Sequence, residues 1–82
     1  MIELISNSNG TPVRNLQIML REIFLYENIL PEVIVDGIFD EVTKEAVLVF
    51  QENNGLPNTG IVDIITFEKI VEKYNKTMRN EK

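Results

Sequence analysis

Residues 37–47 read GIFDEVTKEAV, and residues 60–70 repeat the pattern as GIVDIITFEKI. Glycine, isoleucine, aspartate, threonine and glutamate recur at matched positions. Each copy is typical of a turn glycine, two apolar residues that enter the core, an aspartate that caps a helix, and the helix itself. The cap accepts hydrogen bonds from backbone amides that otherwise lack partners, which contributes about 1 kcal/mol. The repeat therefore predicts two loop-helix units.

The two aspartates set the starts of the predicted helices. With Asp40 as N-cap, apolar spacing predicts a helix over residues 41–53, which Asn54-Gly55 ends. With Asp63 as N-cap, the same spacing predicts a helix over residues 64–76.

A third helix is predicted ahead of the repeat. Thr11 is expected as its N-cap and Pro12 as its first residue, over residues 12–25. We therefore predict an all-α fold of three helices around one core. The residues expected in the buried stripes are apolar: Val13, Leu16, Leu20, Ile23, Phe24, Val42, Ala46, Val47, Val49, Phe50, Phe67, Ile70, Val71 and Tyr74.

Composition excludes several classes of function. The 82 residues contain no cysteine and no histidine, which excludes disulfides, the usual zinc sites and Ser-His or Cys-His nucleophile pairs. Thirteen acidic against eight basic residues give a net charge of −5, which disfavours nucleic acid and anionic membranes as partners. No window approaches the ~20 apolar residues of a membrane span. Glu68 and Glu72 are expected on a solvated helix face, where they would not act as a catalytic pair. Because the usual catalytic groups and metal ligands are missing, we expect a protein that is not an enzyme and that holds no cofactor and no metal.

Several short motifs occur in a fixed order: VRNLQ at 13–17, VDGIF at 35–39, FQ at 50–51, GLP at 55–57 and TGIVD at 59–63. In this order and spacing they resemble the peptidoglycan-binding-like domain of bacterial cell-wall hydrolases and spore proteins. The connector with Leu30-Pro31 resembles the version common in clostridial spore-formers.

The resemblance implies an orthogonal three-helix bundle that docks on wall polymer, usually beside a separate catalytic domain. We expect residues 1–10 to form an N-terminal extension, residues 11–76 the peptidoglycan-binding-like domain, and residues 77–82 a flexible tail.

The expected ligand-binding residues are mostly uncharged and polar, because amide and hydroxyl groups recognise a neutral glycopeptide. They are Tyr26, Gln51, Asn53, Asn54, Asn58 and Thr59. Each has a structural alternative: Tyr26 as packing, the polar run 51–59 as a solvated turn, and Gln51, like Gln17, as a hydrogen-bonded tie between loop and helix.

We expect a non-catalytic module that recognises peptidoglycan or another wall glycopeptide and targets a fused or separate wall hydrolase. The alternative is a protein-protein assembly module, for example in a spore coat. The setting is then the cell wall, the spore or the exterior, if the segment is exported within a larger chain. The N-terminus lacks a signal-peptide pattern, so a cytoplasmic location is the alternative.

Overall fold

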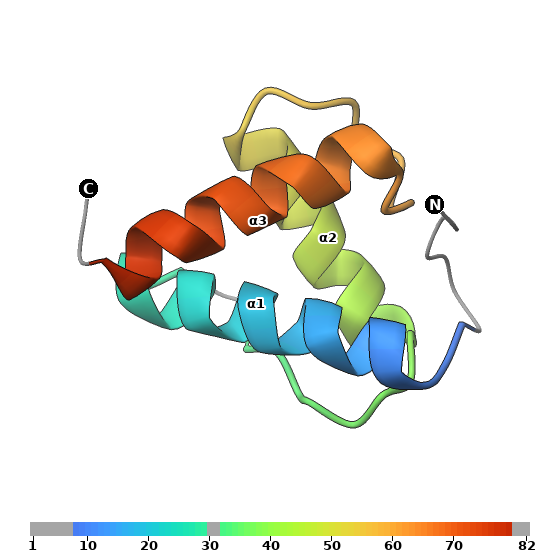
Figure 1. Ribbon diagram of the computed structural model, residues 1–82. Helices are drawn as coiled ribbons and strands as arrows, with labels where there is room; N and C mark the ends of the chain where they lie inside the picture. Colours follow the sequence, from blue (N-terminus) through green and yellow to red (C-terminus); the bar gives the residue numbers. More distant parts are fainter. Residues whose placement is uncertain (1–7, 30–31, 80–82) are drawn as a thin grey trace.

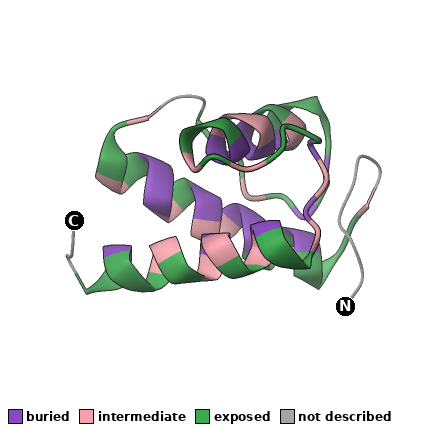
Figure 2. Ribbon diagram, turned by 90° about the horizontal axis from the view of Figure 1, so that it is seen from above, coloured by how far each residue is buried: buried purple, intermediate pink, exposed green. Residues whose placement is uncertain are grey.

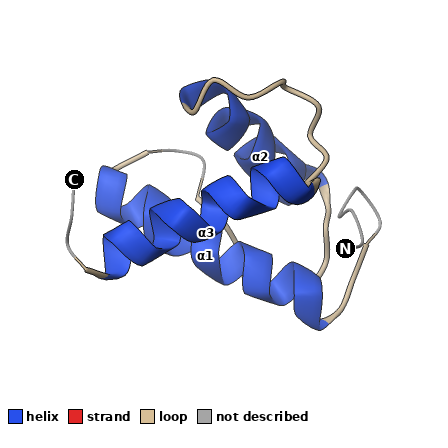
Figure 3. Cartoon of the chain, turned by 45° about the horizontal axis from the view of Figure 1, so that its top comes forward, coloured by secondary structure: helices blue, strands red, loops and turns tan. Residues whose placement is uncertain are grey.

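The computed structural model describes residues 8–29 and 32–79, and these form three helices (Figure 1). They are α1 (Thr11–Glu27), α2 (Glu41–Asn53) and α3 (Ile64–Met78). The most extensive helix-helix packing is between α1 and α3, while α2 lies across both (Figures 1 and 3). The predicted all-α three-helix fold is confirmed. The predictions for residues 1–7, Leu30-Pro31 and 80–82 lie outside the described residues.

Both aspartate caps of the repeat are confirmed. The Asp40 carboxylate accepts a hydrogen bond from the Thr43 amide at 3.2 Å. The Asp63 carboxylate accepts the equivalent bond from the Thr66 amide at 2.9 Å. Each bond satisfies an amide of the first turn that has no partner within the helix, so both helices start where the sequence predicts.

The predicted cap of the first helix is wrong. Thr11 lies inside α1, and Gly10 is the N-cap, with φ 97° and no side-chain cap bond. The reason is tertiary: the Gly10 amide donates to the Gly37 carbonyl at 2.9 Å, and the Phe39 amide donates to the Ser8 carbonyl at 2.9 Å. Ser8–Gly10 are thus tied to the first loop of the repeat, while the domain boundaries themselves stay a prediction.

Two helices also run past their predicted ends. α1 continues to Glu27, where Asn28 ends it in the left-handed conformation with φ 57°. α3 continues to Met78 and buries Thr77. An asparagine tolerates positive φ better than most residues, so it stops α1 as a glycine would.

The core lies where α1, α2 and the two loops meet α3 (Figure 2). Its buried apolar residues are Val13, Leu16, Leu20, Ile23, Phe24, Val33, Phe39, Ala46, Val47, Phe50, Val62 and Ile70. On α3 only Ile70 of the predicted stripe is fully buried, and Phe67, Val71 and Tyr74 are half-buried.

Val42 was expected in the core and is 40% exposed, so that prediction is wrong. The first turn of α2 directs Thr43 inward instead, because Thr43 binds the Gln17 side chain. Only the second apolar residue of each repeat enters the core fully, as Phe39 and Val62, because successive side chains of extended backbone point to opposite sides. Ile38 is accordingly 53% exposed.

Within the described residues, each helix is too short or too polar to cross a lipid bilayer.

The Asp63 cap should make part of the free energy of unfolding depend on pH. The hydrogen bonds from the Thr66 amide and then from its hydroxyl hold the pKa of the Asp63 carboxyl below its usual value. Because the folded-state pKa is the lower one, the ionised cap stabilises the fold above about pH 4 and this contribution is lost as the pH falls through the folded pKa.

Asp63→Asn keeps a good cap but cannot titrate, so its melting temperature should fall less than the wild type's between about pH 5 and about pH 2.5. Thermal melts across that range check the difference. Parallel profiles for the two proteins would refute the proposed contribution of the ionised cap.

Candidate functional site

Two buried glutamines organise the two loops of the repeat. Gln17 lies on α1 and is 0% exposed. Its Oε1 accepts hydrogen bonds from the amides of Asp36 at 3.0 Å and Gly37 at 2.8 Å. Its Nε2 lies within hydrogen-bond distance of the Asp36 carboxylate at 3.1 Å, the Ile38 carbonyl at 2.9 Å and the Thr43 hydroxyl at 2.9 Å. One side chain therefore fixes the first loop and the start of α2.

Gln51 on α2 makes the same set of contacts with the second loop. It is 1% exposed. Its Oε1 accepts from the amides of Thr59 at 3.1 Å and Gly60 at 3.0 Å. Its Nε2 lies within hydrogen-bond distance of the Thr59 hydroxyl at 3.2 Å, the Ile61 carbonyl at 3.1 Å and the Thr66 hydroxyl at 3.2 Å. The expected structural role of both glutamines, as ties between loop and helix, is confirmed.

The repeat is therefore larger than the sequence pattern indicated. Each unit consists of a helix with a glutamine, a loop and a following helix, and α2 belongs to both units. Among the described residues, every buried side-chain nitrogen and oxygen has a hydrogen-bond partner. Because an unpaired buried polar group costs about 1–3 kcal/mol, this pairing makes the loops well-defined surfaces rather than loose connections.

The turn glycine of each loop adopts a left-handed backbone. Gly37 has φ 77° and Gly60 has φ 74°. A Cβ at Gly60 would lie 3.1 Å from Cε of Lys44, whereas a Cβ at Gly37 would lie 3.6 Å from the nearest atom, the Gly10 carbonyl oxygen. At Gly37 the requirement for glycine is thus conformational rather than steric.

Gly37→Val should lower the free energy of unfolding by about 2 kcal/mol, because a β-branched residue is strained at positive φ. Gly37→Asn is the matched control and should lose less than about 1 kcal/mol, since asparagine tolerates this region. Urea denaturation measures both. Equal losses for the two variants would show that φ does not determine the effect.

The predicted polar run lies at the end of α2 and in the connector over residues 54–63, which arches from α2 to α3 (Figure 1). Asn53, Asn58 and Thr59 are exposed, and Asn54 is half-buried. The side-chain amide of Asn54 donates to the Phe50 carbonyl at 2.8 Å. Along the described chain, the side-chain amides of Asn53 and Asn58 make no hydrogen bond with protein groups. Both residues are exposed, so these side-chain donors and acceptors face solvent.

Thr59 and Gln51 contribute to this surface differently. The Thr59 hydroxyl accepts from the Ile61 amide at 3.1 Å and also contacts Gln51. The Gln51 side chain lies inside, beneath the loop, with its oxygen and nitrogen both bonded. It therefore shapes this loop from below and does not present its own side-chain amide to solvent.

Tyr26 is not brought to this surface. It lies half-buried on the last turn of α1. That turn lies beside the C-terminal half of α3 (Figures 1 and 3). There, Nζ of Lys73 is 3.7 Å from a carboxylate oxygen of Glu27. The structure thus separates Tyr26 from the other five predicted residues.

The connector is neutral except for its last residue, Asp63, whose carboxylate caps α3. Residues 54–62 contain no charged side chain. Two free amides and a fixed backbone can exchange hydrogen bonds with hydroxyl and amide groups, and they do so without attracting or repelling ions. No group of three or more acidic residues in the described part of the chain is placed to hold a metal ion.

Comparison with known families identifies the arrangement of two glutamine-centred loops between three helices. A family model described as "Putative peptidoglycan binding domain" matches residues 9–70. The match includes both glutamines, both loops and both aspartate caps. A search of curated proteins finds none that matches the chain.

Proposed function

The chain belongs to the peptidoglycan-binding domain family, and we propose from this that it is a non-catalytic module that docks on the glycopeptide of the bacterial cell wall. The family is one of wall-binding modules, which supports a cell-wall setting for the chain. The observation that carries the proposal is the match over residues 9–70, which covers both glutamine-centred units.

We propose the neutral connector as the contact surface. Wall glycan offers hydroxyl and acetamido groups, and the exposed amides of Asn53 and Asn58 are donors and acceptors of matching kind. The Asn54 side chain bonds the Phe50 carbonyl at the end of α2, the Thr59 hydroxyl accepts from the Ile61 amide, and Gln51 holds Thr59 from below. A small open surface of this kind gives weak single-site binding, with a Kd of about 10 μM to about 1 mM.

Weak binding suits a module that concentrates a fused or separate wall hydrolase on its substrate. The wall presents many equivalent sites, so rebinding and multivalency raise the retention of the whole protein well above that of one contact. The proposal therefore gives the chain a targeting role, with the chemistry performed elsewhere.

A pelleting assay with insoluble wall sacculi tests the contact surface. The double variant Asn53→Ala, Asn58→Ala should lower the bound fraction at least about threefold, because each lost hydrogen bond contributes about 0.5–1.5 kcal/mol. The matched control is Asn15→Ala, Asn75→Ala, which removes two exposed amides from α1 and α3 and should bind like the wild type. Equal binding of all three proteins would reject the connector as the contact surface.

A further inference from the structure

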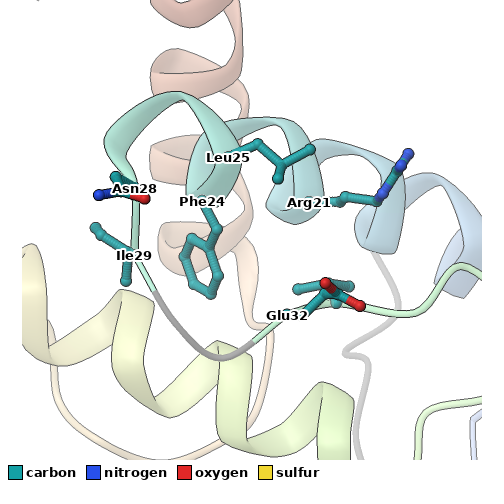
Figure 4. A pocket seen from close by; sticks show the side chains of 7 residues that line it. Arg21, Phe24, Leu25, Asn28, Ile29 and Glu32 are labelled. Carbon is teal, nitrogen blue, oxygen red and sulfur yellow. The ribbon is translucent and has the colours of Figure 1, made fainter.

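A hollow lies at the C-terminal end of α1 (Figure 4). Its volume is about 120 Å³. A cavity of about 150 Å³ accepts a benzene molecule, so this hollow accommodates one amino-acid side chain. The residues that line it are Arg21, Phe24, Leu25, Asn28, Ile29, Glu32 and Val33.

The floor of the hollow is apolar and well anchored. Phe24 and Val33 are each 3% exposed and belong to the core. The Ile29 amide donates to the Phe24 carbonyl at 2.9 Å, which fixes the wall beyond the left-handed Asn28. The floor is thus preformed and suits a short aliphatic or methyl group.

The rim carries one charge of each sign. In Figure 4, Arg21 and Glu32 lie on one side of the Phe24 ring, and Asn28 and Ile29 lie on the other. No ion pair joins Arg21 to Glu32 within the described residues. Arg21 has only a 3.9 Å contact with Glu22, in which both side chains are well exposed. The guanidinium and the Glu32 carboxylate are both available to a ligand.

A ligand with both signs of charge fits this rim better than a simple ion. The net charge of −5 disfavours a purely anionic ligand, and a purely cationic ligand is attracted to many exposed carboxylates elsewhere. An ammonium and a carboxylate on the same carbon have no net charge, and Glu32 and Arg21, which both line this hollow, offer one partner for each of the two charges.

We infer that the hollow between Arg21 and Glu32 binds a zwitterionic amino-acid centre carried on an aliphatic chain. The inference rests on the proposed wall-binding function, which supplies the source: the free end of a diamino-acid residue in the stem peptide of the wall. The carboxylate pairs with Arg21, the ammonium pairs with Glu32, and the aliphatic chain lies on Phe24 and Val33. The module would then distinguish uncrosslinked stem peptides, since a crosslink through the ammonium removes one charge.

The test is a titration of the isotope-labelled protein, followed by amide NMR shifts, with soluble stem peptides. Three probes are needed: a peptide with the free diamino-acid centre, the same peptide with that carboxylate amidated, and the same peptide with that amine acetylated. Free norvaline is a fourth probe, because it offers the zwitterion without the stem peptide. The free centre should shift the amides of residues 24–29 and 33, and each masked probe should bind about fivefold more weakly.

Charge-removing variants connect the effect to the rim. Arg21→Gln should abolish the preference over the amidated probe, and Glu32→Gln should abolish the preference over the acetylated probe. Arg14→Gln and Glu45→Gln remove exposed charges elsewhere and should keep both preferences. Norvaline binding at the same amides supports the zwitterion as the recognised group, and tighter binding of the stem peptide supports the wall as its source.

The inference and the proposed function fail separately. If the wild type pellets with sacculi but no probe shifts the amides around the hollow, the zwitterion site is wrong and the wall-binding function stands. If the free and masked probes bind equally, the site is also wrong. If the wild type does not pellet but norvaline binds at the hollow with the expected variant effects, the site stands and its assignment to the wall is wrong.

Discussion

Gln51→Leu is expected to lower the free energy of unfolding by about 3–5 kcal/mol. Leucine is close in size to glutamine, so it adds no large cavity. It does remove one partner from the amides of Thr59 and Gly60, the Ile61 carbonyl and the Thr66 hydroxyl. The Thr59 amide keeps the Pro57 carbonyl at 3.0 Å and the Ile61 carbonyl keeps the Thr59 hydroxyl at 3.4 Å, whereas the Gly60 amide loses its partner. Each buried group left unpaired costs about 1–3 kcal/mol, less what water recovers at the loop surface. A domain of this size has a total margin of only about 5–10 kcal/mol, so the variant should be close to unfolding.

The chain supplies its own comparison for this result. Gln17→Leu removes the equivalent contacts from the first loop and should cost a similar amount. Glu52→Leu makes a change to leucine at the neighbouring exposed position and should alter stability by less than about 0.5 kcal/mol. Chemical denaturation measures all three. A loss below about 1 kcal/mol for both glutamine variants would contradict their organising role.

Phe50→Ala should cost about 3–5 kcal/mol as well, by a different mechanism. Phe50 is 1% exposed and lies in the core cluster on α2, one residue before the organising glutamine. Removing the ring takes apolar area out of the interior and leaves a cavity that the three helices close only in part.

Phe67→Ala is the matched control for this prediction. Phe67 is half-buried and packs against the core from α3, so its loss should be clearly smaller, about 1–2 kcal/mol. The midpoints and slopes of urea denaturation curves give both values. Similar losses at the two positions would show that Phe50 does not contribute more to the core than the half-buried Phe67.

The elements that the sequence predicted correctly depend on local contacts. Asp40 and Asp63 each bond an amide three residues ahead, so their caps follow from a short pattern. The position of Gly10 as the N-cap of α1 depends instead on its hydrogen bond with Gly37, which is distant in sequence. For this reason the local pattern wrongly predicted Thr11 as the cap. Val42 fits a helical stripe by spacing alone, but the inward position belongs to Thr43 because Gln17 binds it.

The candidate site was predictable in part for the same reason. Asn53 is the last residue of α2 and Asn58 lies in the connector, and both are exposed, as polar residues at the end of a helix and in a loop usually are. Tyr26 was grouped with them by residue type, but α1 carries it to another part of the molecule. No sequence pattern indicated the hollow at the end of α1, because Arg21 and Glu32 are eleven residues apart, one on a helix and the other on an irregular connector.

The central claim is that this chain binds the cell wall, and depletion of the wild-type protein by increasing amounts of insoluble sacculi tests it most directly. We expect saturable depletion with a Kd of about 10 μM to about 1 mM. Because the proposed surface is neutral, the Kd should change less than about twofold between about 50 and about 300 mM salt. No depletion beyond that of an unrelated acidic protein, at the highest wall load, would contradict the claim.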